Sequence, residues 1–246
     1  MLPAQGSAFG LLVLFVVDQR NAPSDGARSA LVLGLIMAVN VSALVIRFRG
    51  ATVMLEIELH TPRLRLRGWR TEDLRGFAAL NADPEVMRHF PSVMSRAQSD
   101  AMARRIQAHF ALHGFGQWVL ERREQPGLIG ALGLQQVNFE AAFTPAVEIG
   151  WRLQRAHWRQ GYAREAAEAV LAYAFESLQL NEVLAFTVPA NRPSQGLMQR
   201  LGMQHQAAQD FEHPLLPVGH PLRQHVLYRL SQASWRTRQA RALPAS

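Results

Sequence analysis

The sequence predicts a mixed α/β domain, and three observations support this. Hydrophobic residues make up 48% of the 246-residue chain, which is enough to build a sizeable core. Segments that alternate charged and apolar residues, as half-buried strands do, are interspersed with segments of helical periodicity. An apolar strand at 147–153, an amphipathic helix after residue 161 and an apolar strand at 183–188 then follow one another, which is the order of a strand–helix–strand crossover.

The first elements are predicted by strand alternation and by helix caps. Residues 63–67 alternate charged and apolar side chains and predict a strand. Thr71 can cap a helix that runs to about residue 80, with acids in its first turn. The Asp-Pro pair at 83–84 predicts a second helix start, because proline suits the first helical position. Ser95 predicts the start of a longer helix that reaches about residue 112.

The later elements follow from turns and apolar runs. A Gln-Pro-Gly turn separates two predicted strands of a meander, at 117–122 and 128–137. After the crossover, a short helix is expected at 194–201, and Gly202 suits its left-handed exit. A last strand is expected at 225–230.

The two ends of the chain differ from the middle. Residues 1–53 carry apolar runs at 9–17 and 30–46, of which the first is too short and the second barely long enough to span a membrane. Our preferred hypothesis is an extension upstream of a natural start at Met54; a membrane hairpin and a disordered or partner-binding arm are the alternatives. Residues 54–230 would form the domain. Residues 231–246 form a polar, Arg-rich tail, for which we expect a frayed helix or disorder.

Composition excludes several classes of function. The chain has no cysteine, which excludes disulfides, thiolate metal sites and a cysteine nucleophile, and suits a cytoplasmic protein. The net charge is +7, but the middle of the chain is nearly neutral, so we expect no nucleic-acid partner. The nine histidines show no metal-binding spacing, so no metal is expected.

The most informative stretch connects the strand at 147–153 to the crossover helix. The backbone N–H groups of Gln160, Gly161, Tyr162 and Ala163 lie at the helix entry, where unpaired donors and the helix dipole attract an anion. Gly161 has no side chain, so a diphosphate can approach the backbone, and Arg159 adds a positive charge. A glycine at this place can also serve a tight turn alone.

These motifs resemble those of a known family. The R-Q-G-Y-A loop at 159–163 is similar to the coenzyme A pyrophosphate loop of the GNAT superfamily, and most of all to the branch typified by ribosomal-protein N-terminal acetyltransferases. That branch also carries a strand like 148–151 and an aromatic residue like Trp158. The segment N-R-P-S at 191–194, followed by L-G-M at 201–203, resembles a second family motif. The resemblance covers residues 59–230.

The resemblance implies a fold and a reaction. The fold would be a single GNAT-like α+β domain with a central, mostly antiparallel sheet that is splayed at the cofactor site and flanked by helices. Acetyl-CoA would be the co-substrate, and a primary amine on a small molecule or a protein N-terminus would attack it directly in a ternary complex. A membrane partner would depend on residues 1–53, and the oligomeric state stays open, a homodimer included. The alternative is a catalytically weak acyl-CoA-binding regulatory module.

Glu148 is the candidate base, acting directly or through water, because a carboxylate partly buried on a sheet has a raised pKa. Its alternative role is an ion pair with an arginine such as Arg152. The resemblance also implies a bulge near Trp151 and Leu153, which would expose backbone N–H groups to the cofactor and to the developing oxyanion.

Two residues of the 191–194 segment are further candidates. Many family members have a tyrosine as the acid at the position of Met198, which cannot donate a proton. The resemblance therefore assigns the acid to Ser194, which could instead cap its helix. Asn191 would bind the pantetheine arm, or serve only as a turn residue.

The acceptor pocket is less well defined by the sequence. By family analogy it would lie near 83–112 and 139–145, with the His-Phe-Pro stretch at 89–91 in its lining. His213, His220 and His225 lie near a loop that could overhang this pocket, and we expect them to be solvated.

Overall fold

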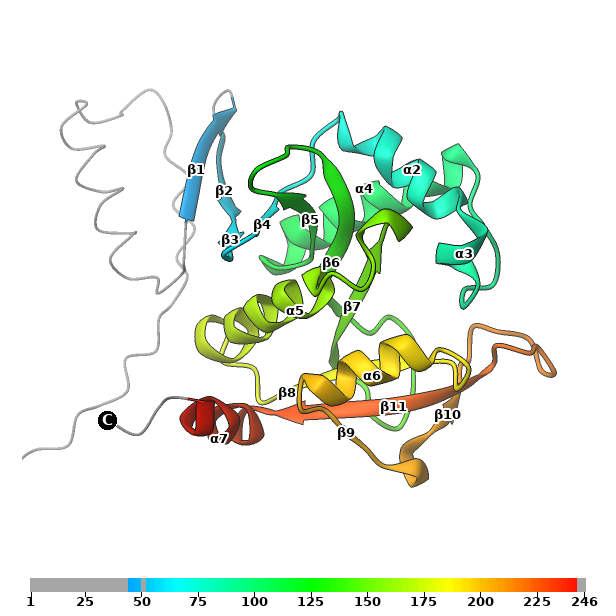
Figure 1. Cartoon of the computed structure of the whole chain (residues 1–246). Helices are drawn as coiled ribbons and strands as arrows, with labels where there is room; N and C mark the ends of the chain where they lie inside the picture. The colour runs from blue at the N-terminus through cyan, green and yellow to red at the C-terminus, as the bar shows by residue number, and fades with distance from the viewer. Residues whose placement is uncertain (1–43, 50–51, 243–246) are drawn as a thin grey trace, which may run out of the picture.

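The computed structural model describes residues 44–49 and 52–242, and its main feature is one open sheet with helices on both faces (Figure 1). The strand order is β10-β11-β8-β7-β6-β5-β4-β3, with β9 paired to β11. All pairs are antiparallel except β7–β8, so the predicted α/β class and mostly antiparallel sheet are confirmed. The strands of this sheet are β3 (Leu59–His60), β4 (Leu64–Arg67), β5 (Gln117–Arg122), β6 (Leu128–Gln136), β7 (Val147–Leu153), β8 (Glu182–Thr187), β9 (Gln204–His205), β10 (Phe211–Glu212) and β11 (Gln224–Ser231).

Two further strands form a separate hairpin. β1 (Leu44–Arg49) pairs antiparallel with β2 (Thr52–Ile57), and the hairpin spans the start predicted at Met54. The two apolar runs of the N-terminal extension lie almost wholly outside the described residues.

Local caps explain where most of the first helices begin. Helices α2 (Asp73–Ala82), α3 (Pro84–Met87) and α4 (Arg96–His113) connect β4 to β5. Asp83 caps α3 by accepting the N–H groups of Glu85 and Val86, and Ser95 caps α4 in a capping box with Gln98, as predicted.

The predicted cap of α2 at Thr71 is wrong. The N-cap position is Glu72, and no side chain there accepts a hydrogen bond. Instead, the Asp73 carboxylate accepts the Arg70 N–H at 2.7 Å and two N–H groups of the buried Arg67 guanidinium. A buried ion pair therefore fixes the start of this helix.

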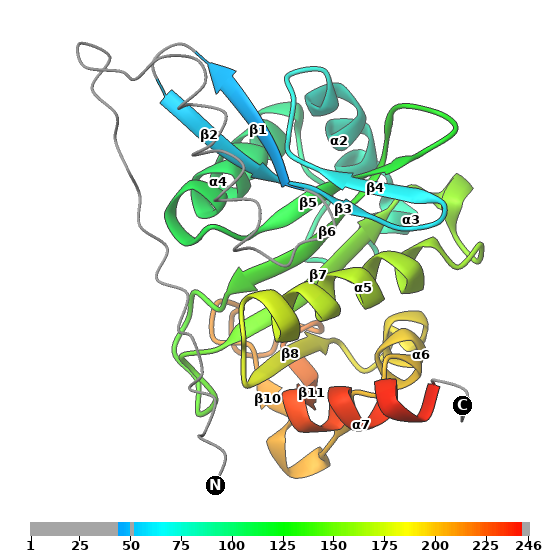
Figure 2. The ribbon, with the colours of Figure 1, turned by 90° about the vertical axis from the view of Figure 1, so that its left-hand side faces the viewer.

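The sheet separates two apolar layers. On one face, α2 and α4 pack over Ala131 of β6. On the other face lie α5 (Tyr162–Ala172), extended by a π-helical turn at Tyr173–Ser177, and α6 (Arg192–Arg200). Figure 2 shows α5 lying between the β3–β7 half and the β8–β11 half. The α5 helix is therefore the element that connects the two halves of the sheet.

The segment after Ser231 is a packed helix. It forms α7 (Gln232–Ala242), which lies against β11, and the Trp235 side chain is only 2% exposed. The Arg238 guanidinium donates to the Leu201 carbonyl and to Glu168 on α5, both at 2.9 Å. The packed unit thus continues beyond residue 230, where the sequence places the domain end.

Candidate active site

The parallel strands β7 and β8 diverge, and this divergence opens the centre of the sheet. They share a single pair, Glu148 with Leu184, and then separate along their length. The register between β6 and β7 is continuous over seven pairs, from Gln136–Val147 to Gly130–Leu153. The bulge expected in β7 is therefore wrong, and the sheet is splayed because β8 leaves the edge of β7.

The divergence leaves backbone donors free at the edge of β7. The Gln154 N–H, directly after β7, donates to the Ile129 carbonyl on the β6 side at 2.9 Å. Because N–H groups alternate between the two edges of a strand, those of Leu153 and Trp151 point toward β8. Neither N–H has a hydrogen-bond partner among the described residues. Both predicted residues thus present a backbone N–H to the gap between the strands.

The loop after β7 delivers the N-terminus of α5 to the same place. Arg159 and Gly161 have left-handed φ angles of 57° and 82°, which turn the chain into the helix. No side chain caps α5, and its first backbone bond runs from the Glu165 N–H to the Gly161 carbonyl. The N–H groups of Tyr162 and Ala163 lie before that bond, where an α-helix offers no partner.

The predicted loop residues act mainly through their backbone in this geometry. The Tyr162 side chain is buried in the core, and Ala163 packs against it. The Gln160 side chain donates to the Ala156 carbonyl at 2.7 Å, and Arg159 is exposed. The result is a turn lined by amides beside an exposed guanidinium, an arrangement that suits an anion.

A second arginine lies beside this turn and was not singled out from the sequence. Arg63 donates through Nη1 to the Gln160 carbonyl at 2.9 Å and through Nε to Glu165 at 2.6 Å. A Cβ on Gly161 would lie 3.2 Å from Arg63 Nη2, so this amino group borders the turn. Arg63 comes about 100 residues earlier in the chain, and it lies here because the β3–β4 turn packs against the start of α5.

The 191–194 segment faces the other side of the gap. Asn191 caps α6 by accepting the Ser194 N–H at 3.3 Å, and it donates to Thr187 at the end of β8. Ser194 does not cap the helix; its hydroxyl accepts the Trp151 indole N–H at 3.2 Å. Met198 is buried in the core. Ser194 is therefore held next to the splayed edge of β7, while Asn191 is already occupied as a cap.

Glu148 lies on the opposite face of β7 from Trp151. Its carboxylate accepts the Gln135 amide N–H at 2.7 Å, and Gln135 accepts the Gln117 amide at 3.1 Å. No arginine pairs with Glu148 among the described residues, and burial raises its pKa to about 7. The sequence alternative of an ion pair with Arg152 is thus not what the structure contains. A carboxyl group with this pKa can accept a proton near neutral pH.

Arg152 lies on the same face of β7 and contacts the helical layer. Its Nη1 donates to the Asn81 side chain on α2, and its guanidinium lies 4.2 Å from the centre of the Phe90 ring. Burial lowers the pKa of Arg152 to about 10. The predicted 89–91 stretch therefore reaches the site through Phe90.

An aromatic cluster borders the same face further along the sheet. It combines the β6–β7 connection with β8, β10 and β11, and its rings approach to 4.6 Å between Phe139 and His213. His213 and His225 are half-buried in it, and burial lowers the pKa of both, so the expectation of solvated side chains is wrong for these two. The members are Phe139, Phe143, Phe186, Phe211, His213 and His225.

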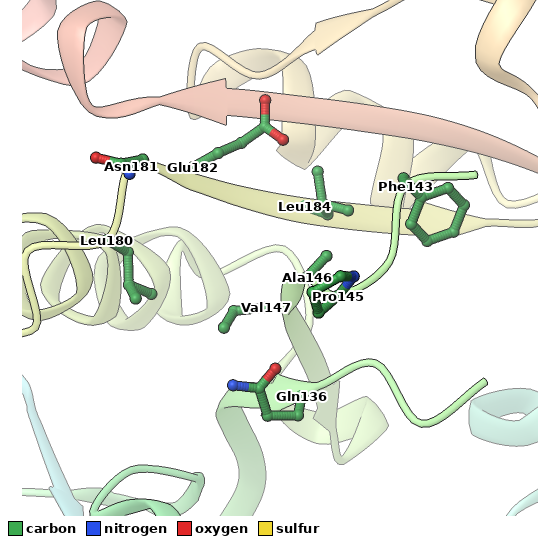
Figure 3. Close-up of a pocket in the computed structure, with 9 residues that line it drawn as sticks. All are labelled: Gln136, Phe143, Pro145, Ala146, Val147, Leu180, Asn181, Glu182 and Leu184. Carbon is green, nitrogen blue, oxygen red and sulfur yellow. The ribbon is translucent and has the colours of Figure 1, made fainter. Parts of the chain in front are cut away.

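A cavity of about 310 Å³ adjoins this cluster where β7 and β8 still pair (Figure 3). Phe143 belongs to both the cluster and the cavity lining, and Val147 of β7 and Leu184 of β8 also line the cavity. None of the predicted catalytic or cofactor-binding residues lines it. The cavity thus lies at the paired end of β7 and β8, apart from the gap where these strands diverge.

Within residues 44–49 and 52–242, no three His, Asp or Glu side chains are grouped as metal ligands would be. No helix among the residues that the structure describes has the length and apolarity needed to cross a membrane.

Comparisons with known proteins identify the family. A model of the family described as "Acetyltransferase (GNAT) domain" matches residues 63–204. The uncharacterized N-acetyltransferase p20 of Bacillus licheniformis is 32% identical over 160 residues, which cover 63% of this chain and 86% of the relative. The FsC-acetyl coenzyme A-N(2)-transacetylase of Aspergillus fumigatus is 32% identical over 165 residues, which cover 63% and 68%.

The fold agrees with a solved structure of the same family. Spermidine N-acetyltransferase from Vibrio cholerae, solved in complex with CoA and spermine, superposes with a TM-score of 0.58 at 19% identity, and the match covers 72% of this chain and 99% of that one. At this identity the likeness concerns the fold. Taken with the matching family model and relatives, it shows that the chain belongs to the GNAT acetyltransferases and is an N-acetyltransferase.

Proposed function

We propose that the chain transfers an acetyl group from acetyl-CoA to a primary amine by direct attack in a ternary complex, with the cytoplasm as its proposed location. The observation that carries this proposal is the gap between β7 and β8, which holds unpaired N–H groups of Trp151 and Leu153 and ends at the uncapped start of α5. The residues fit acetyl-CoA, because a strand edge with free amides suits an amide-bearing arm and a helix N-terminus suits a diphosphate.

The two faces of β7 would divide the work. In the proposed reaction the amine nitrogen bonds to the acetyl carbon, the carbon–sulfur bond breaks, and Glu148 takes the proton that the amine gives up. The free N–H groups at the edge of β7 stabilise the charge that develops on the carbonyl oxygen. Ser194, whose hydroxyl accepts the Trp151 indole N–H, would donate a proton to the leaving sulfur. The amine belongs to a small molecule or a protein N-terminus.

One observation favours a second candidate function. Met198 occupies the position where many family members have a tyrosine, and its side chain is buried in the core, so it offers no proton. A catalytically weak module that binds an acyl-CoA for regulation is therefore the alternative. Acetylation of any amine that depends on Glu148 or Ser194 would exclude this alternative.

Calorimetric titration of acetyl-CoA into the whole chain tests the cofactor half of the proposal. We expect micromolar binding, about −8 kcal/mol, and loss of binding in Gly161→Glu, because the new carboxylate would lie in the anion site. Gly114→Glu is the matched control, since Gly114 has a similar φ of 73° at the exposed end of α4 with open space around it. No binding to the folded wild-type chain would overturn the proposed function.

A further inference from the structure

The face of β7 that carries Glu148 also carries a cation, with a glycine between them. Glu148, Gly150 and Arg152 alternate along one side of the strand. A Cβ on Gly150 would meet only the Gln117 amide, at 3.7 Å, so the strand surface between Glu148 and Arg152 is open. An extended ligand can therefore lie along β7 from one charged group to the other.

Arg152 has no carboxylate partner among the described residues. Its one hydrogen bond to an oxygen is from Nη1 to Asn81, and its remaining polar contact is with Met102 Sδ at 3.8 Å. Nε is the single buried side-chain nitrogen or oxygen in the described chain that lacks a partner. Nη2 has no hydrogen-bond partner among the described residues and is not fully buried, so it remains open to a ligand.

The other arginines around the site differ from Arg152. Arg155, three residues on, pairs with Asp83 at 2.9 Å, and the buried Arg67 pairs with both Asp73 and Glu121. A buried charge without a counter-ion destabilises the fold, and such a group in a cleft is a candidate binding residue. Arg152 is thus a buried cation whose carboxylate partner is missing among the residues that the structure describes.

The geometry of the guanidinium defines the ligand that fits. Phe90 covers one flat face, so a ligand must approach the edge in the plane of the group. Nη1 is bonded to Asn81 and Nε is buried, so Nη2 is the group on this edge that can donate to a carboxylate oxygen in a charge-assisted hydrogen bond. The Cα atoms of Glu148 and Arg152 are four strand residues apart, which is about 13 Å.

We propose that Arg152 binds a carboxylate of the acceptor, so that the acceptor is a short peptide or an extended amino-acid derivative whose amine reaches Glu148. The inference rests on the proposed function. An extended tripeptide spans about 10 Å, which suits the distance between the two side chains. An α-amino acid is too short, because its amine and carboxylate share one carbon.

The test uses the acetylated product, so that it does not depend on turnover. Calorimetry would compare N-acetyl-trialanine with its C-terminal amide, each titrated into the whole chain saturated with CoA. We expect the free acid to bind at least tenfold more tightly. The preference should vanish in Arg152→Gln and persist in Arg155→Gln, while both variants keep the CoA affinity of the wild type.

The outcomes that contradict this expectation distinguish a failure of the carboxylate site from a failure of the proposed function. Equal binding of acid and amide to the wild type, no detectable binding of the acid, or a preference that persists in Arg152→Gln would each overturn the carboxylate site. In these cases normal acetyl-CoA binding would leave the proposed function standing. Absence of acetyl-CoA binding to the wild type would overturn the proposed function and this inference with it.

Discussion

Glu148 is a carboxyl group whose surroundings favour its neutral form. It sits at the last pair that β7 and β8 share, and its single hydrogen-bond partner among the described residues is an amide rather than a cation. Burial without a counter-charge is the cause that raises its pKa to about 7. At neutral pH the group is therefore close to half ionised, and small pH changes alter the fraction that can accept a proton.

The first prediction concerns the pH dependence of acetyl transfer. In the wild type, kcat/KM should rise with pH through an inflection near 7 and then level off, because the ionised carboxylate is the base. Glu148→Gln should lower kcat/KM by about 10²- to 10⁴-fold and remove that inflection. Steady-state rates between pH 5.5 and 9 measure both, and an unchanged inflection in the variant would show that another group titrates.

Glu148→Gln should lower activity but raise stability at high pH, so a loss of activity cannot be ascribed to unfolding. A raised acid pKa means that the folded state disfavours the ionised carboxylate, so stability is lost as pH rises from the unfolded-state pKa to about 7 and then levels off. Glu148→Gln mimics the neutral form. It should match the wild type in melting temperature at pH 4 and exceed it at pH 8. A variant that is less stable at pH 8 would contradict the raised pKa.

At the scale of elements, the start of α5 is held by a strand pair from the other end of the domain. Thr61 and Arg63, next to β4, both donate to Glu165 on the first turn of α5, at 2.6 to 2.8 Å. These three hydrogen bonds form a clamp that occupies the Glu165 carboxylate. They lower the pKa of Glu165, although its partial burial alone would raise it. The clamp leaves Arg63 Nη2 beside the amide-lined turn.

The second prediction follows from this placement. Arg63→Met should weaken acetyl-CoA binding by about tenfold and make it less sensitive to salt, because a charge next to the diphosphate is removed. Arg75→Met is the control, since it changes net charge equally at an exposed position of α2. Calorimetry at 50 and 300 mM salt measures both effects. Equal losses in the two variants would assign the effect to net charge alone.

Local features such as helix caps could be predicted from the sequence, whereas contacts between distant strands could not. Asp83 and Ser95 cap helices through bonds to residues two or three positions away, so their sequence patterns predict them correctly. The splay of the sheet, by contrast, depends on how β8 leaves β7, and these strands are joined only through α5. The bulge was expected from the family resemblance, and local patterns could not correct it because they carry no information about that distant strand. Arg63 and Gln135 were not identified as site residues for the same reason.

At the scale of the whole molecule, α5 and α7 hold the two halves of the splayed sheet together. Three contacts link α7 to elements of both the crossover and the C-terminal half. Gln232 donates to the Phe175 carbonyl at 2.9 Å, and Arg238 bonds to both Glu168 and the Leu201 carbonyl. The composition of α7 is polar and Arg-rich, which hid its packing from sequence reasoning. One large side chain, Trp235, supplies the buried contact.

The last prediction tests whether this helix is part of the folded unit. The Trp235 ring lies 5.8 Å from that of Phe175 and is almost fully buried, so Trp235→Ala should reduce the free energy of unfolding by about 3 to 5 kcal/mol. Arg236→Ala, one residue further and exposed, should change it by less than about 0.5 kcal/mol. Urea unfolding of the whole chain measures both values.

Acetyl-CoA affinity distinguishes a support role from a role in the site. Trp235 contacts the C-terminal end of the crossover helix, whereas the anion site lies at its N-terminal end, more than ten residues away. Trp235→Ala should therefore keep the wild-type affinity at temperatures where it remains folded. A large stability loss with unchanged affinity would place α7 in the folding unit of the acetyltransferase domain. If Trp235→Ala is as stable as the wild type, residues 232–242 do not contribute to the stability of the domain.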